Sequence, residues 1–242
     1  MQNDPIGFAD FDGKDYTLDL VSDSKGNITG VNISGTVYIQ GNGADEERAE
    51  ELNSYASSHL QSKNINGINV SVKIKYSYDK NKNSKSLKAG ENILTFANNS
   101  GISHIEGIEL REGKNVKLLT GNTGVIYNDD VNDDNVIFHE SLHLLGLSDR
   151  YDDFRDIGNY IGPASVPHKG FENDIMGNRE KTNVSRYHYE QWLNHALLRV
   201  KGNSNVKRVI GLMQVDRDGN GNLRTNKEKG GIHKYSPYAN NH

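Results

Sequence analysis

The sequence contains no cysteine and only four prolines among its 242 residues. Without thiols the chain can form neither disulfides nor a thiolate metal site, so a transition-metal site would have to use histidine, carboxylate or carbonyl ligands. The formal net charge of −4 gives no reason to expect a nucleic-acid partner. No apolar run approaches the roughly 20 residues that cross a bilayer, so no membrane partner is expected either.

The first residues also lack the features of a secretory signal. The sequence begins MQNDPIGFADFDG, which has neither a basic n-region nor an apolar h-region. Hydrophobic residues make up 34% of the chain, whose length suits one principal domain. We expect a leader or connector at 1–26, a principal domain at 27–205 and a C-terminal extension at 206–242. The principal domain is expected to divide near residue 146 into an N-terminal and a smaller C-terminal subdomain.

Helix and strand patterns succeed one another along the first half of the chain. Residues 44–62 begin with acidic side chains and repeat apolar residues at helical spacing, which predicts a helix. Strict alternation of apolar and polar residues at 68–76 predicts the clearest strand. Further strands are predicted at 16–21, at 28–41 as a strand or hairpin, and in the segments ENILTFAN, VKLLT and GVIYN. This order predicts an α+β fold with a twisted, mixed sheet.

The stretch FHESLHLLGLSDR, residues 138–150, contains two histidines with a glutamate between them. Residues 133–145 have carboxylates at the start, apolar residues nearly all round and Gly146 after the end, which predicts a buried helix. A buried helix can hold one histidine for packing alone. Two histidines and a glutamate buried without partners would, however, cost several kcal/mol in desolvation.

A divalent metal ion is a suitable partner for these side chains. On a helix, His139 and His143 project from one face, one turn apart, and Glu140 lies beside them. That separation suits two corners of a zinc tetrahedron. Gly146 can turn the chain with positive φ, so that Asp149 reaches the same ion. The string H-E-x-x-H-x-x-G-x-x-D thus predicts three ligands, a base and the turn between them.

This string resembles the metzincin clan of zinc metallopeptidases, in the variant where aspartate replaces the usual third histidine. The resemblance extends to Met176 in NDIMGN, because the clan has a methionine turn below its metal. It implies a zincin-like fold with an active-site helix, in which one zinc ion is bound by His139, His143 and Asp149. It also implies that Glu140 acts as general base and acid.

One position departs from the clan's pattern. Several metzincins have a tyrosine two residues after the methionine, whereas this chain has Asn178. The oxyanion-stabilising tyrosine is therefore not assigned, and Tyr187 and Tyr189 are candidates if their segment folds back towards the site. Glu172 is an alternative third ligand, as in gluzincins, although its segment FENDIMG has no helical pattern.

The predicted activity is hydrolysis of peptide bonds in a protein or peptide substrate, with zinc-activated water and Glu140 as base. Substrates of the clan lie extended along an edge strand, and GVIYN, just upstream of the helix, is the expected strand here. The alternative is a non-catalytic protein-binding module with a structural zinc site. Glu140 favours the enzyme, because a site that only holds metal does not need an unliganded carboxylate beside its ligands.

The N-terminal segment NDPIGFADFDGKD resembles the segment that closes the core of Rhs-repeat polymorphic toxins, some of whose C-terminal toxins are metallopeptidases. That resemblance implies a bacterial effector or toxin domain, secreted or delivered as part of a longer polypeptide. Its partner would be a cognate immunity or inhibitor protein. A cluster of polar turns is the alternative interpretation of the same residues.

Other candidate sites have weaker patterns. The segment DRDGNGN at 216–222 matches the first half of a Ca²⁺ loop, but Lys227 stands where a bidentate glutamate belongs, so a polar turn is expected. Single histidines, expected at the surface or satisfied in the core, are His104, His168, His188 and His195.

Overall fold

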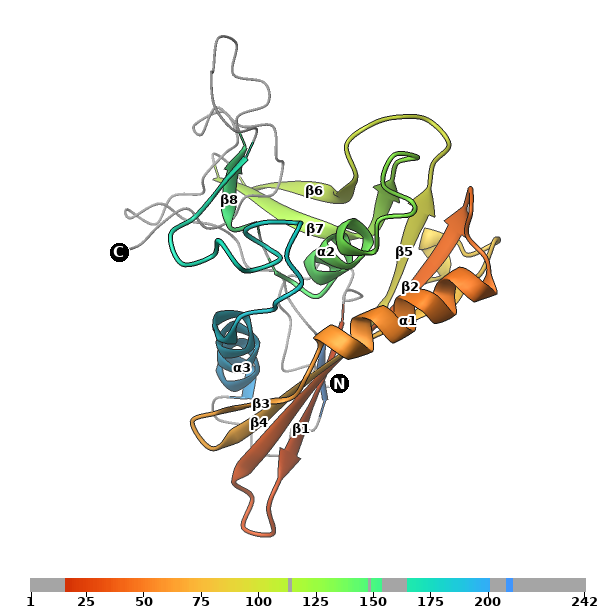
Figure 1. The fold of residues 1–242 in the computed structure, drawn as a ribbon. Coiled ribbons are helices and arrows are strands. Elements are labelled where there is room, and N and C mark those ends of the chain that lie inside the picture. Colours follow the sequence, from red (N-terminus) through yellow and green to blue (C-terminus); the bar gives the residue numbers. More distant parts are fainter. Residues whose placement is uncertain (1–15, 113–114, 148, 154–164, 201–207, 211–242) are drawn as a thin grey trace.

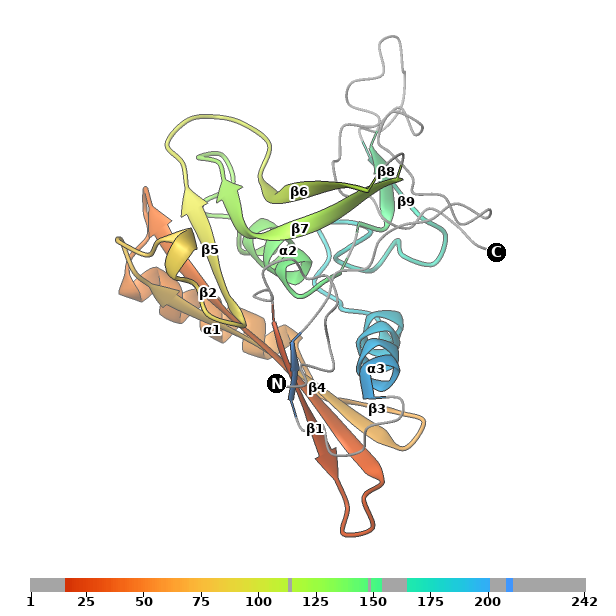
Figure 2. The same ribbon diagram turned by 180° about the vertical axis from the view of Figure 1, so that it is seen from behind.

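An eight-stranded mixed sheet runs through the molecule, and helices pack against one of its faces (Figures 1 and 2). The computed structural model describes residues 16–112, 115–147, 149–153, 165–200 and 208–210. Within these residues the fold is mixed α+β, as the sequence predicts. The segments NDPIGFADFDGKD and DRDGNGN lie outside the described residues.

The described elements follow one another in an order that resembles the predicted one, with additional short strands. Residues 28–41 form one strand and not a hairpin. The elements are β1 (Thr17–Ser22), β2 (Ile28–Gly41), α1 (Glu46–His59), β3 (Lys63–Ile65), β4 (Ile68–Tyr78), the 3₁₀-helix η1 (Ser84–Ser86), β5 (Glu91–Phe96), β6 (His104–Glu112), β7 (Asn115–Ile126), α2 (Asp134–Leu144), β8 (Tyr151–Asp153), β9 (Ser165–Pro167), α3 (Arg186–Val200) and β10 (Arg208–Ile210).

The long strand β2 is the centre of the sheet. One of its edges pairs with β4 in parallel. The other edge is shared, because Ser34 pairs with Thr17 of antiparallel β1 and Thr36 pairs with Glu91 of parallel β5. Beyond β5 the sheet continues with parallel β7 and then antiparallel β6. Strands β3 and β4 form a hairpin on the opposite side of β2.

The prediction that GVIYN is a separate edge strand is wrong. Strand β7 is continuous, and its end lies inside the sheet, since Gly124 pairs with Leu94 of β5 on one side and with Ile105 of β6 on the other. The edge strand among the described residues on this side is β6, which the sequence analysis did not identify. Strand β6 contacts α2, so this edge of the sheet is the one close to the predicted zinc helix.

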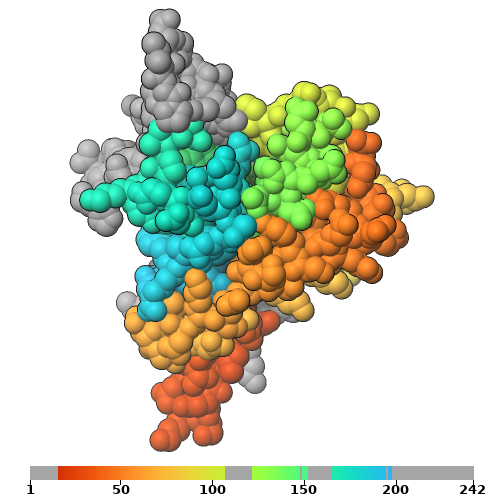
Figure 3. Space-filling view, viewed as in Figure 1, coloured from red at the N-terminus to blue at the C-terminus, as the bar shows by residue number. Residues whose placement is uncertain are grey.

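The helices α1 and α2 lie on the face of the sheet that Figure 1 shows, and Figure 2 shows the opposite face. Strand β4 has the burial pattern of such a half-covered sheet, with Val72 and Ile74 buried and Lys73 and Lys75 exposed. In the space-filling view α1 and α3 lie on either side of the segment that contains α2 (Figure 3). None of the described helices is long and apolar enough to span a membrane.

Two buried hydrogen bonds attach α2 to its surroundings. The Tyr76 hydroxyl of β4 donates to Ser141 Oγ in the middle of the helix at 2.8 Å. The Trp192 indole of α3 donates to the Leu145 carbonyl at the helix end at 2.8 Å. Both aromatic side chains are almost fully buried, so α2 is fixed from the sheet side and from the α3 side.

The main sheet includes residues from both terminal segments. Strand β1 pairs with β2, and Tyr16 and Leu18 are buried in the core. Strand β10, beyond residue 205, pairs with β1. The sheet therefore crosses the boundaries that the sequence suggested at residues 26 and 205.

Candidate metal centre

The helix α2 begins where Asp133 caps it. The Asp133 carboxylate accepts hydrogen bonds from the backbone N–H groups of Asn135 and Val136, and Asp134 adds negative charge to the first turn. All residues from 136 to 144 are buried. The sequence prediction of a buried, acid-capped helix is confirmed.

Gly146 ends α2 in a Schellman motif. Its φ is 82°, and its N–H donates to the His143 carbonyl at 2.8 Å, while the Leu147 N–H donates to the Leu142 carbonyl at 3.1 Å. The turn brings the Leu147 carbonyl back to the helix, where it lies 2.8 Å from His143 Nδ1. The predicted glycine turn is thus present, and it also orients the second histidine.

The structure brings His139, His143 and Asp149 together. The two Nε2 atoms lie 3.2 Å apart, and Asp149 Oδ1 lies 3.1 Å from His139 Nε2 and 3.3 Å from His143 Nε2. All three side chains are buried, and they are a group that could hold a metal ion. Ligand atoms of a tetrahedral zinc site with bonds of about 2.0–2.1 Å stand about 3.3 Å apart. The three atoms therefore fit one face of such a site.

The protonation of the two histidines favours a cation between them. His139 Nδ1 lies 2.9 Å from the Ile175 carbonyl, and His143 Nδ1 lies 2.8 Å from the Leu147 carbonyl. A carbonyl oxygen can only accept, so each Nδ1 carries the proton and each neutral ring presents a bare Nε2 lone pair. Two lone pairs and a carboxylate oxygen that meet within 3.3 Å require a shared positive charge.

The electrostatics of the metal-free cluster agree with this requirement. Burial lowers the pKa of His139, which opposes a charge on that ring. Burial acts against protonation of His143 as well, but the Asp149 carboxylate outweighs it and raises the pKa of His143 to about 9. Near neutral pH the cluster accordingly holds one proton, in the place where a metal ion would be bound.

The segment around Met176 forms hydrogen bonds with His139 and with the residue that follows Asp149. The Ile175 carbonyl accepts from His139, and the Met176 carbonyl accepts from the Arg150 N–H at 2.7 Å, next to Asp149. Met176 itself is fully buried. The residue that the sequence assigned to a methionine turn therefore lies in a segment that contacts His139 and the residue next to Asp149.

The turn at 174–177 depends on a glycine. The Gly177 N–H donates to the Asp174 carbonyl at 3.0 Å and closes the turn. A Cβ atom at Gly177 would stand 2.1 Å from the Phe171 carbonyl oxygen, a distance that no side chain tolerates. Glycine is required here for a close approach of two backbone segments.

Asp174 is an organising residue that the sequence analysis missed. Its carboxylate accepts from the Met176 N–H at 2.8 Å and from the Ser185 N–H at 2.8 Å, and it lies 2.9 Å from His188 Nε2. Burial raises the pKa of Asp174, but the hydrogen bonds and charge of its partners lower it overall. His188, read from the sequence as a single histidine, is this buried partner. Asp174 and His188 are too far apart in the sequence for a local pattern to predict that they form a pair.

The predicted base, Glu140, is buried beside the ligands. Only 4% of its surface is exposed, it follows His139 on α2, and its charge contributes to raising the pKa of His143. The Tyr187 hydroxyl accepts from Arg150 Nη2 at 3.2 Å, next to Asp149, and 40% of the Tyr187 surface is exposed.

Tyr189, the other tyrosine candidate, has a different environment. It is buried against Trp192, with Lys63 Nζ 4.7 Å from its ring centre, and burial raises its pKa to about 12. Among the described contacts of the two candidates, it is Tyr187 that bonds to Arg150, next to the candidate ligand Asp149.

The alternative ligand Glu172 is not part of the cluster among the described residues. Its carboxylate is exposed and accepts from the Gly170 N–H at 3.0 Å. His104 and His168 are partly exposed and also lie outside the group. The side chain of His195 lies outside the described residues.

Three comparisons with known proteins give no assignment. No family model matches the chain, and neither the curated proteins nor the solved structures include a match. The functional argument consequently depends on the geometry of the cluster.

Proposed function

We propose that the protein is a zinc-dependent endopeptidase. The observation that carries the proposal is the triangle formed by Asp149 Oδ1 and two histidine Nε2 atoms of the buried helix α2, with sides of 3.1–3.3 Å. The same helix carries Glu140. Three protein ligands leave a fourth tetrahedral position for water, as in catalytic zinc sites.

When bound, a zinc ion supplies Lewis-acid chemistry, which activates water near neutral pH and polarises a peptide carbonyl. The chain's own residues do the rest. His139 and His143 are held in the correct tautomer by backbone carbonyls, and Asp149 balances the charge. Glu140 accepts the proton of the attacking water and delivers it to the leaving amine.

An extended substrate would bind along β6 in this proposal. Strand β6 ends the described sheet on the side of α2, so one row of its backbone N–H and C=O groups is available for pairing. A peptide that adds to this edge would be aligned by main-chain hydrogen bonds near the helix that carries the ligands.

The metzincin-like character of the fold is part of the same proposal. It is supported by the glycine turn between His143 and Asp149 and by the buried Met176 turn, whose backbone carbonyls contact His139 and the Arg150 N–H next to Asp149. We further propose that the domain acts as a toxin or effector delivered on a longer polypeptide and is blocked by a dedicated inhibitor. That setting is supported by the N-terminal sequence resemblance alone.

The test combines metal analysis with a cleavage assay. The purified protein should contain close to one zinc ion per chain and should cut a peptide library or an unfolded protein. Glu140→Gln should keep the zinc and lose cleavage by several orders of magnitude, because only the base is removed. Glu172→Gln, an exposed control, should change neither property. Equal cleavage by wild type and Glu140→Gln would refute Glu140 as the base, and full zinc content without cleavage by either protein would favour a structural zinc site.

A further inference from the structure

The edge of β4 that faces away from β2 is only partly covered. Strand β3 pairs with residues 68–70 of β4, and no described strand pairs with residues 71–78 on that edge. The helix α1 packs against β4 beside this open stretch. β4 and β6 lie on opposite sides of the sheet, so this edge is separate from the one proposed for the substrate.

Asn53 of α1 shows which backbone groups point outwards. Its side chain accepts from the Tyr76 N–H at 2.8 Å and donates to the Tyr76 carbonyl at 2.9 Å, as a neighbouring strand would do. Strand residues direct their N–H and C=O groups to alternate edges. The backbone groups of Ile74 and Val72 therefore point to the same edge as those of Tyr76, towards the space beside α1.

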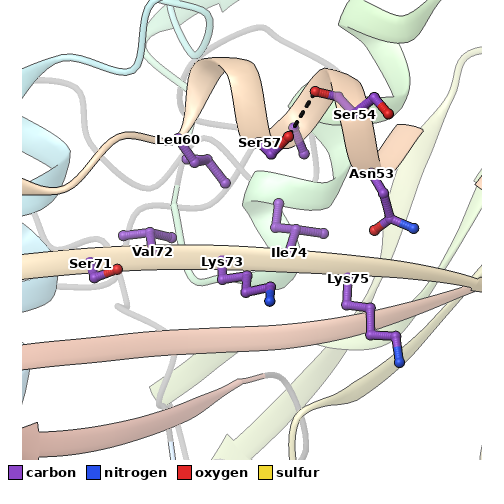
Figure 4. Close-up of a pocket in the computed structure, with 10 residues that line it drawn as sticks. Asn53, Ser54, Ser57, Leu60, Ser71, Val72, Lys73, Ile74 and Lys75 are labelled. Carbon is purple, nitrogen blue, oxygen red and sulfur yellow. Dashed lines mark hydrogen bonds between the residues drawn. The ribbon is translucent and has the colours of Figure 1, made fainter. Parts of the chain in front are cut away.

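That space is a groove with two different walls (Figure 4). Its volume is about 550 Å³, and it is lined by residues of α1 and β4. Val72 and Ile74 of β4 lie on the helix side together with Leu60, which directly follows α1, whereas Lys73 and Lys75 project from the other side of the strand. A strand added here would present alternate side chains to the helix side, where Leu60 lies with Asn53, Ser54 and Ser57, and to two ammonium groups.

Charge decides between the candidate occupants. Among the described residues, those that line the groove include Lys73 and Lys75 and no carboxylate. A second copy that added its own β4 edge would bring four lysines together, and like charges on paired strands are unfavourable. Lysines on an edge strand oppose such self-association but leave the edge open to an acidic chain.

We propose that the open edge of β4 is a docking site for an extended, acidic segment of a partner protein, which adds a strand beside residues 71–75. The segment would alternate apolar and acidic residues, with apolar side chains towards Leu60 and carboxylates towards Lys73 and Lys75. Main-chain hydrogen bonds to Val72 and Ile74 would fix how the residues of the segment align with those of β4. This site is independent of the metal centre.

The probe for this site is an acetylated octapeptide in which glutamate and valine alternate. Fluorescence anisotropy of the labelled peptide should show saturable binding, and hydrogen exchange should slow in residues 71–75. The double variant Lys73→Glu and Lys75→Glu should weaken binding at least tenfold, and the control Lys80→Glu and Lys85→Glu should not. All four lysines are exposed, so neither variant is expected to disturb folding. The measurements are repeated on Glu140→Gln protein, which removes peptide cleavage as a cause of signal loss.

Two peptides sharpen the test. A version with lysine in place of glutamate should fail to bind, and a version N-methylated at alternate residues should lose affinity because it cannot pair with β4. Absence of binding, or binding that is unaffected by charge reversal at Lys73 and Lys75, overturns the proposal. A concentration-dependent dimer that protects residues 71–75 without peptide would assign the edge to a second copy and overturn it as well.

Discussion

Zinc should raise the melting temperature of the metal-free protein, and Asp149 should decide how much. The three ligand atoms are already within 3.3 Å of one another in the folded chain. All three side chains are buried, and hydrogen bonds to backbone carbonyls orient the two histidines, whereas an unfolded chain would not hold the three atoms together. Binding therefore stabilises the folded state selectively.

The size of the effect follows from linkage. A ligand at 100 times its Kd adds about 2.7 kcal/mol to the free energy of unfolding. For domains of 150–250 residues each kcal/mol shifts Tm by about 2–4 °C. For this chain of 242 residues the expected rise in Tm is then about 5–11 °C.

Scanning calorimetry of chelator-treated protein in buffered zinc measures this shift directly. Asp149→Ala leaves two histidine ligands and should lose most of the shift. Glu172→Ala is the matched control, because its carboxylate lies in an exposed turn and its removal should leave the shift intact. A wild-type Tm that zinc leaves unchanged would refute the metal site. A larger loss in Glu172→Ala than in Asp149→Ala would refute the assignment of the third ligand.

Three further predictions follow from the same residues. Zinc binding near pH 7 should release about one proton, which calorimetry in buffers of different ionisation heat can measure. The affinity for zinc should rise with pH up to about 9, because His143 of the metal-free protein loses its proton there. Asp174→Ala should lower the free energy of unfolding by about 3–5 kcal/mol, because it leaves buried partners unpaired. Since the pKa of Asp174 is lowered in the folded state, that loss should be full above pH 4–5 and shrink as pH falls through the folded pKa, as denaturant titrations would show. Expression of the wild type should slow bacterial growth and Glu140→Ala should not; equal growth would argue against toxicity through proteolysis.

The parts of the site that the sequence predicts are those set by contacts within a few residues. The ligand spacing on α2, the cap at Asp133 and the turn at Gly146 are local features, and each is present in the structure. Strand β4 is similarly predictable, because its alternation of buried and exposed residues is a local consequence of one covered face.

One error in the sheet concerns a glycine-containing segment. VKLLT and GVIYN were predicted as two strands, whereas β7 continues through residues 121–123 between them. A Cβ atom at Gly124 would stand 2.5 Å from Ile105 Cδ1 and 2.8 Å from Leu94 Cδ2, so glycine is there to let neighbouring side chains cross the strand. A glycine can stand in a sequence because a turn needs it or because another segment packs closely against it. Only the packing in the folded structure distinguishes these two reasons.

The two histidine rings of the candidate metal centre are oriented in different ways, one by a neighbouring residue and one by a residue distant in the sequence. His143 receives its orientation from Leu147, within the same glycine turn, and this part follows from the sequence. His139 receives its orientation from Ile175, in a turn that Asp174 holds by accepting from the Met176 N–H. Without that turn His139 Nδ1 would lose the carbonyl that fixes its tautomer, and its Nε2 lone pair would no longer be directed at the shared position. In the proposed zinc site, the affinity for metal therefore depends on a segment that supplies no ligand. Disrupting the Asp174 turn should weaken zinc binding while His139, His143 and Asp149 all remain.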